Sequence, residues 1–230
     1  IDWKKQNQVF SDMAALAGRT FNLTGDGGPE KLDGYAAAWN LFPLLGVKPA
    51  LGRTFSPEED RPGGPKVVLI SHGLWKRRFG GDPGLVGRDI RVNDEKHAVV
   101  GVMPPEFHYF KQTEIWTPLA FCEEQWSRRG AHFLYVIARL KPGVNLDQAR
   151  IDMDVIMQRL ARDYPENNSD MGARVETLKE QFVGELRRGP VELHVYEAPV
   201  EVQAKVPLQR GGRVLRREDH RDLDTKVDPV

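Results

Sequence analysis

The sequence predicts an α+β fold in which a ferredoxin-like strand–helix–strand unit carries an inserted, mostly β region. In the second half, a strand at 132–140, a helix at 145–164 and a strand at 173–178 follow one another. This order is typical of a sheet layer covered on one side by a helix. In the middle, residues 66–118 hold several short apolar or alternating runs separated by Gly and Pro. Such punctuation predicts consecutive strands.

Composition indicates a globular chain of one large domain or two smaller ones. Of its 230 residues, 40% are hydrophobic and 29% charged, and 33 Lys and Arg balance 33 Asp and Glu. Balanced charge gives no global electrostatic argument for nucleic acid or an anionic membrane. No apolar run approaches the roughly 20 residues that span a bilayer. With no signal peptide and Ile1 at its start, the chain reads as a soluble fragment or trimmed piece of a longer protein.

The first 60 residues mix helix and hairpin signals. Four apolar residues recur at steps of seven, three and three, which predicts an amphipathic helix over 1–16: Trp3, Phe10, Met13 and Leu16. Residues 19–23 and 30–38 then read as a hairpin around the glycine-rich turn at 24–29. No Lys-Ser/Thr follows those glycines, so a hairpin loop explains them better than a phosphate cradle.

Residues 40–60 contain two short helical signals. A short apolar helical turn is expected at 40–47, ended by glycine, and a tight turn at 49–55. Residues 56–60 (SPEED) have the pattern of a helix start, with Ser as the cap, Pro at the first position and acids in the first turn. Their three acids could bind a cation, but a helix N-terminus explains them more economically.

The central stretch predicts strands around one short helix. Residues 66–70 are continuously apolar after Lys66, Ser71 can cap the helix that follows, and Gly80-Gly81 can end it. An alternating run at 88–92 and a second run at 96–102, joined by Asn-Asp-Glu at 93–95, predict a hairpin. After Pro104-Pro105, residues 114–118 read as a short edge strand.

The clearest helix signal lies in the second half. Asn145 with Gln148 makes a capping pair. The apolar residues after it fall on one helical face: Leu146, Ala149, Met153, Ile156, Met157, Leu160 and Tyr164. Pro165 then marks the end of the helix.

No pattern for catalysis or metal binding emerges. The six histidines form no helical metal-binding pair: His72, His97, His108, His132, His194 and His220. Cys122 is the single cysteine, which excludes an internal disulfide framework. A small hydrolase using His72 or His108 is the enzyme alternative, and its motivation is their place near strand ends. We therefore expect no enzyme, no catalytic residue, no cofactor and no metal.

Three aromatic residues beside the Pro-Pro break are the candidate contact residues. Phe107, Tyr109 and Phe110 are expected on a loop. They belong either to the core or to a partner-binding surface, since exposed aromatic clusters mark such surfaces.

Several motifs, in this order and spacing, resemble the MacB-like periplasmic core domain of MacB/FtsX-type ABC transporter permeases. The similarity covers about 185 residues and is closest to the acidobacterial duplicated orphan permease branch. It is carried by NLF at 40–42, LGV at 45–47, LGRTF at 51–55, VVLIS at 67–71, LW at 74–75, RF at 78–79, DP at 82–83, VG at 86–87, Ile90, VVGVMP at 99–104 and WTP at 116–118. The opening Asp2-Trp3, Gln6-Asn7 and Phe10 are similar to the segment after the family's first membrane helix.

The resemblance implies a periplasmic core domain over 1–188. Residues 1–18 and 130–188 would form its porter-like subdomain, and 19–129 an inserted, mostly β, sabre-like subdomain. It also implies a non-enzymatic domain at the periplasmic face of the bacterial inner membrane. Such a domain couples membrane-helix motion to substrate or partner handling during export. A free-standing extracytoplasmic ligand- or protein-binding module is the alternative.

The implied partners are permease membrane helices, a cytoplasmic ATPase and a periplasmic adaptor protein, with no nucleic acid. ATP would act elsewhere, because the chain lacks a Walker A sequence. Beyond about residue 188 the resemblance ends. Residues 189–230 are of mixed charge with few large apolar groups, which predicts a disordered tail.

Overall fold

A computed structural model gives the fold, and it describes residues 2–25, 27–107, 113–127, 133–169, 171–178 and 201–205, the last as backbone. The strands are β1 (Phe10–Thr24), β2 (Glu30–Ala37), β3 (Leu51–Gly52), β4 (Val67–Ile70), β5 (Asp89–Val92), β6 (Glu95–Val102), β7 (Ile115–Pro118), β8 (Leu134–Leu140), β9 (Arg174–Thr177) and β10 (Glu201–Lys205). The helices are α1 (Asp2–Gln6), α2 (Leu41–Leu45), α3 (His72–Phe79), the 3-10 helix η1 (Pro83–Leu85), α4 (Glu123–Ser127), α5 (Leu146–Asp163) and α6 (Pro165–Asn168).

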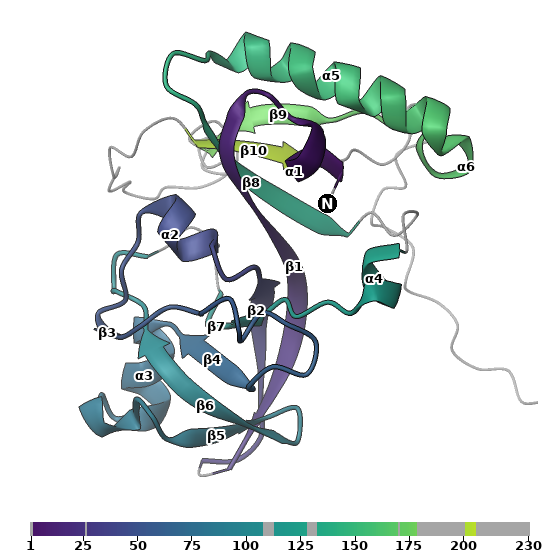
Figure 1. Ribbon diagram of the computed structural model, residues 1–230. Helices are drawn as coiled ribbons and strands as arrows, with labels where there is room; N and C mark the ends of the chain where they lie inside the picture. The colour runs from purple at the N-terminus through teal and green to yellow at the C-terminus, as the bar shows by residue number, and fades with distance from the viewer. Residues whose placement is uncertain are drawn as a thin grey trace, which may run out of the picture.

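Six strands close into a ring. β1 pairs with β2, β2 with β7, β7 with β4, β4 with β6, β6 with β5, and β5 returns to the end of β1. The β2–β7 and β4–β6 pairs are parallel and the other pairs antiparallel. Closure removes free strand edges from this part of the sheet. We call these strands, with α3 and the short β3, the barrel; it forms the lower half of Figure 1.

The second part is an open layer. The first half of β1 pairs with β8, β8 with β10, and β10 with β9, all antiparallel. β8 and β9 are therefore parallel to each other with one strand between them, and α5 connects them. This split strand–helix–strand unit is the ferredoxin-like arrangement, and it confirms the predicted α+β class. We call α1, the first half of β1, β8–β10, α5 and α6 the layer, in which α5 lies across the top of Figure 1.

β1 corrects the predicted N-terminal helix. The helix is limited to Asp2–Gln6, and residues 10–24 form a 15-residue strand. A β-bulge between Phe10 and Asp12 shifts the register, so Phe10 and Met13, three residues apart, pack in the same cluster of the layer. That spacing imitates a helical period, which is why the sequence pattern misled.

Two further expectations are wrong. β7 was expected at a sheet edge, but it pairs with β2 on one side and β4 on the other, and Ile115 and Trp116 are fully buried. At 56–60 no helix starts, and residues 57–60 form turns. There Glu59 accepts the Ser56 amide (2.8 Å) and pairs with the Arg53 guanidinium, so the acid closes a turn instead of opening a helix.

Elements with strong end signals occur as predicted. Ser71 Oγ accepts the amide of Leu74 at 3.0 Å and caps α3, and Gly80 ends that helix with φ of 62°. The β5–β6 hairpin turns at Asn93 and Asp94, which both have positive φ. The predicted capping box of Asn145 and Gln148 is present at the start of α5.

The predicted tail needs a correction at one place. Within 189–230 the structure describes residues 201–205, and these form β10, between β8 and β9. The expectation of a tail without regular structure is therefore wrong for these five residues, and they complete the layer.

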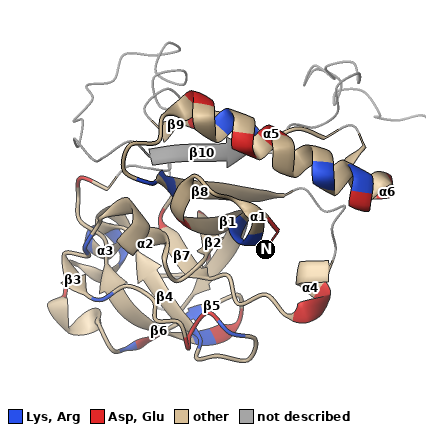
Figure 2. Ribbon diagram, turned by 45° about the horizontal axis from the view of Figure 1, so that its top comes forward, with Lys and Arg blue, Asp and Glu red and all other residues tan. Residues whose placement is uncertain are grey.

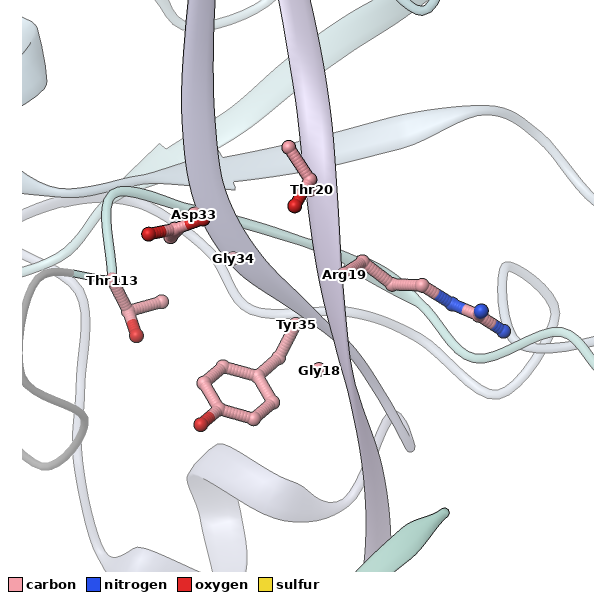
Figure 3. A pocket seen from close by; sticks show the side chains of 7 residues that line it. All are labelled: Gly18, Arg19, Thr20, Asp33, Gly34, Tyr35 and Thr113. Carbon is pink, nitrogen blue, oxygen red and sulfur yellow. The ribbon is translucent and has the colours of Figure 1, made fainter. Parts of the chain in front are cut away.

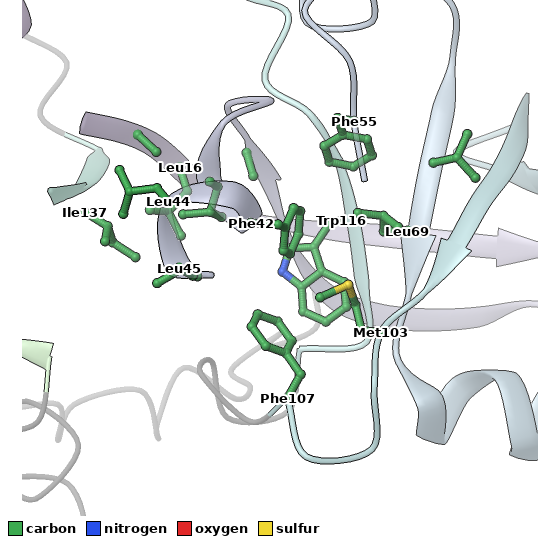
Figure 4. Close-up of a cluster of buried hydrophobic side chains, with 14 of the residues drawn as sticks. Leu16, Phe42, Leu44, Leu45, Phe55, Leu69, Met103, Phe107, Trp116 and Ile137 are labelled. Atoms are coloured by element: carbon green, nitrogen blue, oxygen red, sulfur yellow. The ribbon is translucent and has the colours of Figure 1, made fainter. Parts of the chain in front are cut away.

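The largest core cluster lies where the barrel meets the layer. Phe42 of α2 packs edge-on against Trp116 (ring centroids 6.1 Å apart) and also contacts Phe55 and Phe107. Figure 4 shows these rings to the right of α2, with Ile137 of β8 on the other side of the helix.

Candidate functional site

The predicted aromatic contact residues divide between the core and the undescribed part of the chain. Phe107 is 9% exposed and its ring lies 5.5 Å from that of Trp116, centroid to centroid. It is therefore part of the core, as one of the two interpretations had it. Tyr109 and Phe110 lie outside the described residues, and their contact with a partner stays a prediction.

A shallow hollow lies on the β1–β2 ribbon where the barrel meets the layer. Seven residues line about 370 Å³: Gly18, Arg19, Thr20, Asp33, Gly34, Tyr35 and Thr113. In Figure 3, Tyr35, Asp33 and Thr113 extend to one side of the two strands while Arg19 points away. The lining is mixed and the hollow is open to solvent, unlike the enclosed apolar pockets that hold small molecules.

Two glycines among the lining residues have different surroundings. A Cβ on Gly34 would lie 2.2 Å from the Ile115 carbonyl oxygen, so β2 can pair with β7 only without a side chain there. A Cβ on Gly18 would meet nothing nearer than 3.8 Å, at the Tyr35 ring. The absence of a side chain at Gly34 thus allows β2 to pair with β7 and close the barrel; it is not explained by a need to admit a ligand.

The candidate catalytic groups are not brought together. His72 begins α3, and its ring lies against Trp75 at 5.3 Å. Nδ1 of His97 lies 3.2 Å from the Glu95 carbonyl oxygen on β6. His108 lies outside the described residues, as do His132, His194 and His220. The backbone amide of Cys122 donates to Gln125 Oε1 (3.0 Å) at the start of α4.

The acid run at 58–60 stabilises loops. Glu59 is 5% exposed and its carboxylate binds the Arg53 guanidinium at 2.6 and 3.0 Å. Burial raises the pKa of Glu59, but hydrogen bonds from Arg53 and the Ser56 amide outweigh this. The pKa is therefore below its ordinary value and the carboxyl stays charged. Asp60 accepts the amides of Trp39 (3.0 Å) and Ala120 (2.7 Å). Across the described part of the chain, no group of three or more His, Cys, Asp or Glu is arranged to hold a metal ion.

An ion-pair group stands where β7 begins. Arg77 of α3 binds both oxygens of Glu114 (3.1 and 3.3 Å) and also Glu30 of β2. Partial burial raises the pKa of Glu114 above its ordinary value, Arg77 opposes this, and the nearby Glu30 and Asp33 add to it. The group ties α3, β2 and β7 together, which is a structural role; sequence spacing gave no signal for it.

Charges of both signs are interspersed over α5 and the β5–β6 hairpin (Figure 2). On these elements the mixture of charges agrees with the balanced composition. No helix among the described residues is long and apolar enough to cross a membrane.

Comparison with solved structures shows that the fold is similar to those of extracytoplasmic regions of transporters. The periplasmic region of MacB from Actinobacillus actinomycetemcomitans is similar with a TM-score of 0.54 and 14% identity, covering 71% of this chain and 72% of that one. The extracellular domain of the noncanonic ABC-type transporter YknZ from Gram-positive bacteria is similar with a TM-score of 0.51 and 14% identity, covering 68% and 77%. No curated relative matches the chain by sequence.

The chain belongs to the family of MacB-like periplasmic core domains, whose model matches residues 2–155. It is thus a periplasmic domain of an ABC transporter permease, a class that works with membrane helices and an ATPase. The predicted family is confirmed, while its acidobacterial branch stays a prediction. The family is one of transporter permease domains.

Proposed function

We propose that this domain couples motion of the permease's membrane helices to the handling of a substrate or partner during export. The observation that carries the proposal is β1. It starts four residues after α1 and continues for 15 residues, pairing with β8 in the layer and with β2 and β5 in the barrel. Leu16 and Ala17 pair on both sides at once. At about 3.3 Å per residue the strand reaches roughly 50 Å.

A continuous strand can carry displacement because its backbone hydrogen bonds bind it to both parts. The family resemblance puts the segment at Asp2 next to a membrane helix, so movement there would reach the layer first and the barrel second. The proposal keeps the division into 1–18 with 130–188 and 19–129, with β1 crossing the first boundary. β10 adds residues 201–205 to the first of these units.

A free-standing ligand-binding module is less well supported. Such a module needs a preformed pocket that encloses its ligand, whereas the hollow on β1 and β2 is shallow and mixed in polarity. A periplasmic adaptor is the partner class that we assign to Tyr109 and Phe110, on the chemistry of aromatic contact residues.

The test uses the permease that carries this domain, reconstituted with its ATPase. Spin labels at Lys5 of α1 and Asp89 of β5, both exposed, report the distance between the N-terminal end of the layer and the barrel. We expect this distance to change between the nucleotide-free and ATP-bound states. A label pair inside the barrel, at Lys76 and Asp89, should not change. An unchanged Lys5–Asp89 distance in a complex that hydrolyses ATP would contradict coupling.

A further inference from the structure

α2 fills the angle between the barrel and the layer on one face of β1. It is a five-residue helix in which every residue except Pro43 is buried. It packs against β1 and β8. Its buried side chains share one cluster with Trp116 of the barrel and Ile137 of the layer, and Figure 4 shows them on either side of the helix.

A polar contact attaches the start of α2 to the layer. Asn40 is 5% exposed, and its Nδ2 donates to Asp12 Oδ2 at 2.7 Å and to the Met13 carbonyl at 3.0 Å. The same Asp12 carboxylate accepts from Lys4 Nζ of α1 at 2.9 Å. One carboxylate therefore connects α1, β1 and the residue that precedes α2. A buried amide that lost this acceptor would be costly to leave unpaired.

A second polar contact attaches the end of α2 to the layer. The Arg139 guanidinium of β8 donates to the carbonyl oxygen of Leu44, in the last turn of the helix. The last carbonyl oxygens of a helix receive no hydrogen bond from an N–H group of the same helix. A cationic side chain at this end can donate to them and is favoured by the helix dipole. Gly46, with φ of 71°, ends the helix directly afterwards. Both ends of α2 are thus bonded to the layer while its chain connection, through β2, is to the barrel.

We propose that α2 is a strut that fixes the angle between barrel and layer, and that the contacts of Asn40 with Asp12 and of Arg139 with Leu44 lock it. β1 passes between the two parts as one ribbon, and a ribbon bends and twists more easily than a packed body. The buried helix removes that freedom as long as both of its ends are bonded. Releasing the two contacts frees the hinge without cutting β1.

The inference differs from ordinary core packing in what it predicts. If the two contacts only stabilise the fold, their loss lowers the free energy of unfolding and leaves the angle unchanged. If they lock a strut, their loss broadens the range of angles in the folded state. The strut does not depend on the proposed coupling role, because it concerns the chain at rest without ATPase or membrane.

The experiment measures the angle in the full chain with Cys122→Ser as background. Spin labels at Asp89 of β5 and Gln158 of α5, both exposed, give a distance distribution between barrel and layer. In the Asn40→Ala, Arg139→Gln double variant we expect the distribution to become about twofold wider than in the background chain, as a hinge samples added states. The matched control is Ser71→Ala with Arg77→Gln, which removes a cap and a guanidinium inside the barrel and should leave the width unchanged.

Each single variant, Asn40→Ala and Arg139→Gln, is measured as well, since the double variant can fail to fold. Near-ultraviolet circular dichroism verifies the fold of each. Broadening in the folded single variants, but not in the control, supports the strut. A distribution as narrow as that of the control in both folded single variants would overturn it, whether or not the double variant folds.

Discussion

The barrel and the layer share one strand but are stabilised in different ways. Each of the six barrel strands has a partner on both sides, so the ring is closed by its own hydrogen bonds. The layer is open: among the described residues β9 pairs only with β10, and α5 covers one face with its buried side chains. A closed ring loses several pairings at once when it opens, whereas an open layer can unfold from its edge. We therefore expect the layer to be the less protected part.

Truncating a buried isoleucine to alanine in each part should give the largest loss of stability. Ile115→Ala in β7 and Ile156→Ala in α5 each remove a fully buried side chain, and each should cost about 2–5 kcal/mol. Native-state hydrogen exchange distinguishes the two variants. Ile115→Ala should lower amide protection in both parts, because β7 closes the ring that contains β1, the strand that the layer shares. Ile156→Ala should lower amide protection mainly in the layer. Ile151→Ala, at a 66% exposed position of α5, is the control and should change little. If Ile156→Ala lowered amide protection in the barrel as much as in the layer, the two parts would not differ in how they are stabilised.

A proline in β10 tests whether the distant strand completes the layer. Gln203 pairs with Ile137 on one side and Glu176 on the other. Gln203→Pro removes a ladder donor in a central strand and should cost about 3 kcal/mol. Limited proteolysis should then cut the layer while the barrel persists. Gln203→Ala keeps the backbone donor and should resist proteolysis like the unmodified chain; unchanged resistance of the proline variant would show that the layer does not need β10.

The two glycines of the β1–β2 ribbon test closure of the barrel. Gly34→Ala should destabilise by about 1–3 kcal/mol, because the added methyl overlaps the Ile115 carbonyl oxygen. Gly18→Ala has open space around it and should change the free energy of unfolding by less than about 1 kcal/mol. Denaturant unfolding followed by tryptophan fluorescence measures both. Equal effects would mean that β2 and β7 are not in close contact.

The smallest expected effect is a pair of opposite pH dependences. Burial raises the pKa of Asp12, but hydrogen bonds from Lys4, Asn40 and the Met13 amide leave it below its ordinary 3.8. Its stabilisation is present above that value and is lost as pH falls through the folded-state pKa. Burial raises the pKa of Glu114 above 4.5, so its protonated form favours folding at low pH, and this contribution is lost as pH rises through the folded-state pKa.

Denaturation midpoints between about pH 3 and pH 7 compare the two carboxyls. Asp12→Asn should be less stable than the unmodified chain at neutral pH, and the difference should shrink as the pH falls. For Glu114→Gln, stability relative to the unmodified chain should be highest at neutral pH and decline toward low pH. Slopes of the same sign in both variants would be inconsistent with the environments of these carboxyls.

The sequence predicted those features whose signal and structure lie within a few residues of each other. The cap of α3 at Ser71, the capping box of α5 and the β5–β6 turn each involve neighbours along the chain, so local propensity and tertiary structure agree. The α+β class followed from the order of such elements, and the family from the resemblance of short motifs such as those at 51–55 and 99–104. For the candidate site, the sequence identified Phe107 as one of an aromatic group but could not choose between core and surface.

Only the tertiary structure decided the features that depend on distant partners. Residues 10–24 form a strand because β8, β2 and β5 pair with it, and the bulge after Phe10 disguises its period. β7 is central because β2 and β4 flank it, and residues 201–205 form β10 because β8 and β9 accept them. A strand's hydrogen bonds all go to other segments, whereas a helix satisfies most of its own. Sequence patterns therefore determined the helices α3 and α5 by themselves, and the sheet that joins barrel to layer was decided by long-range pairing.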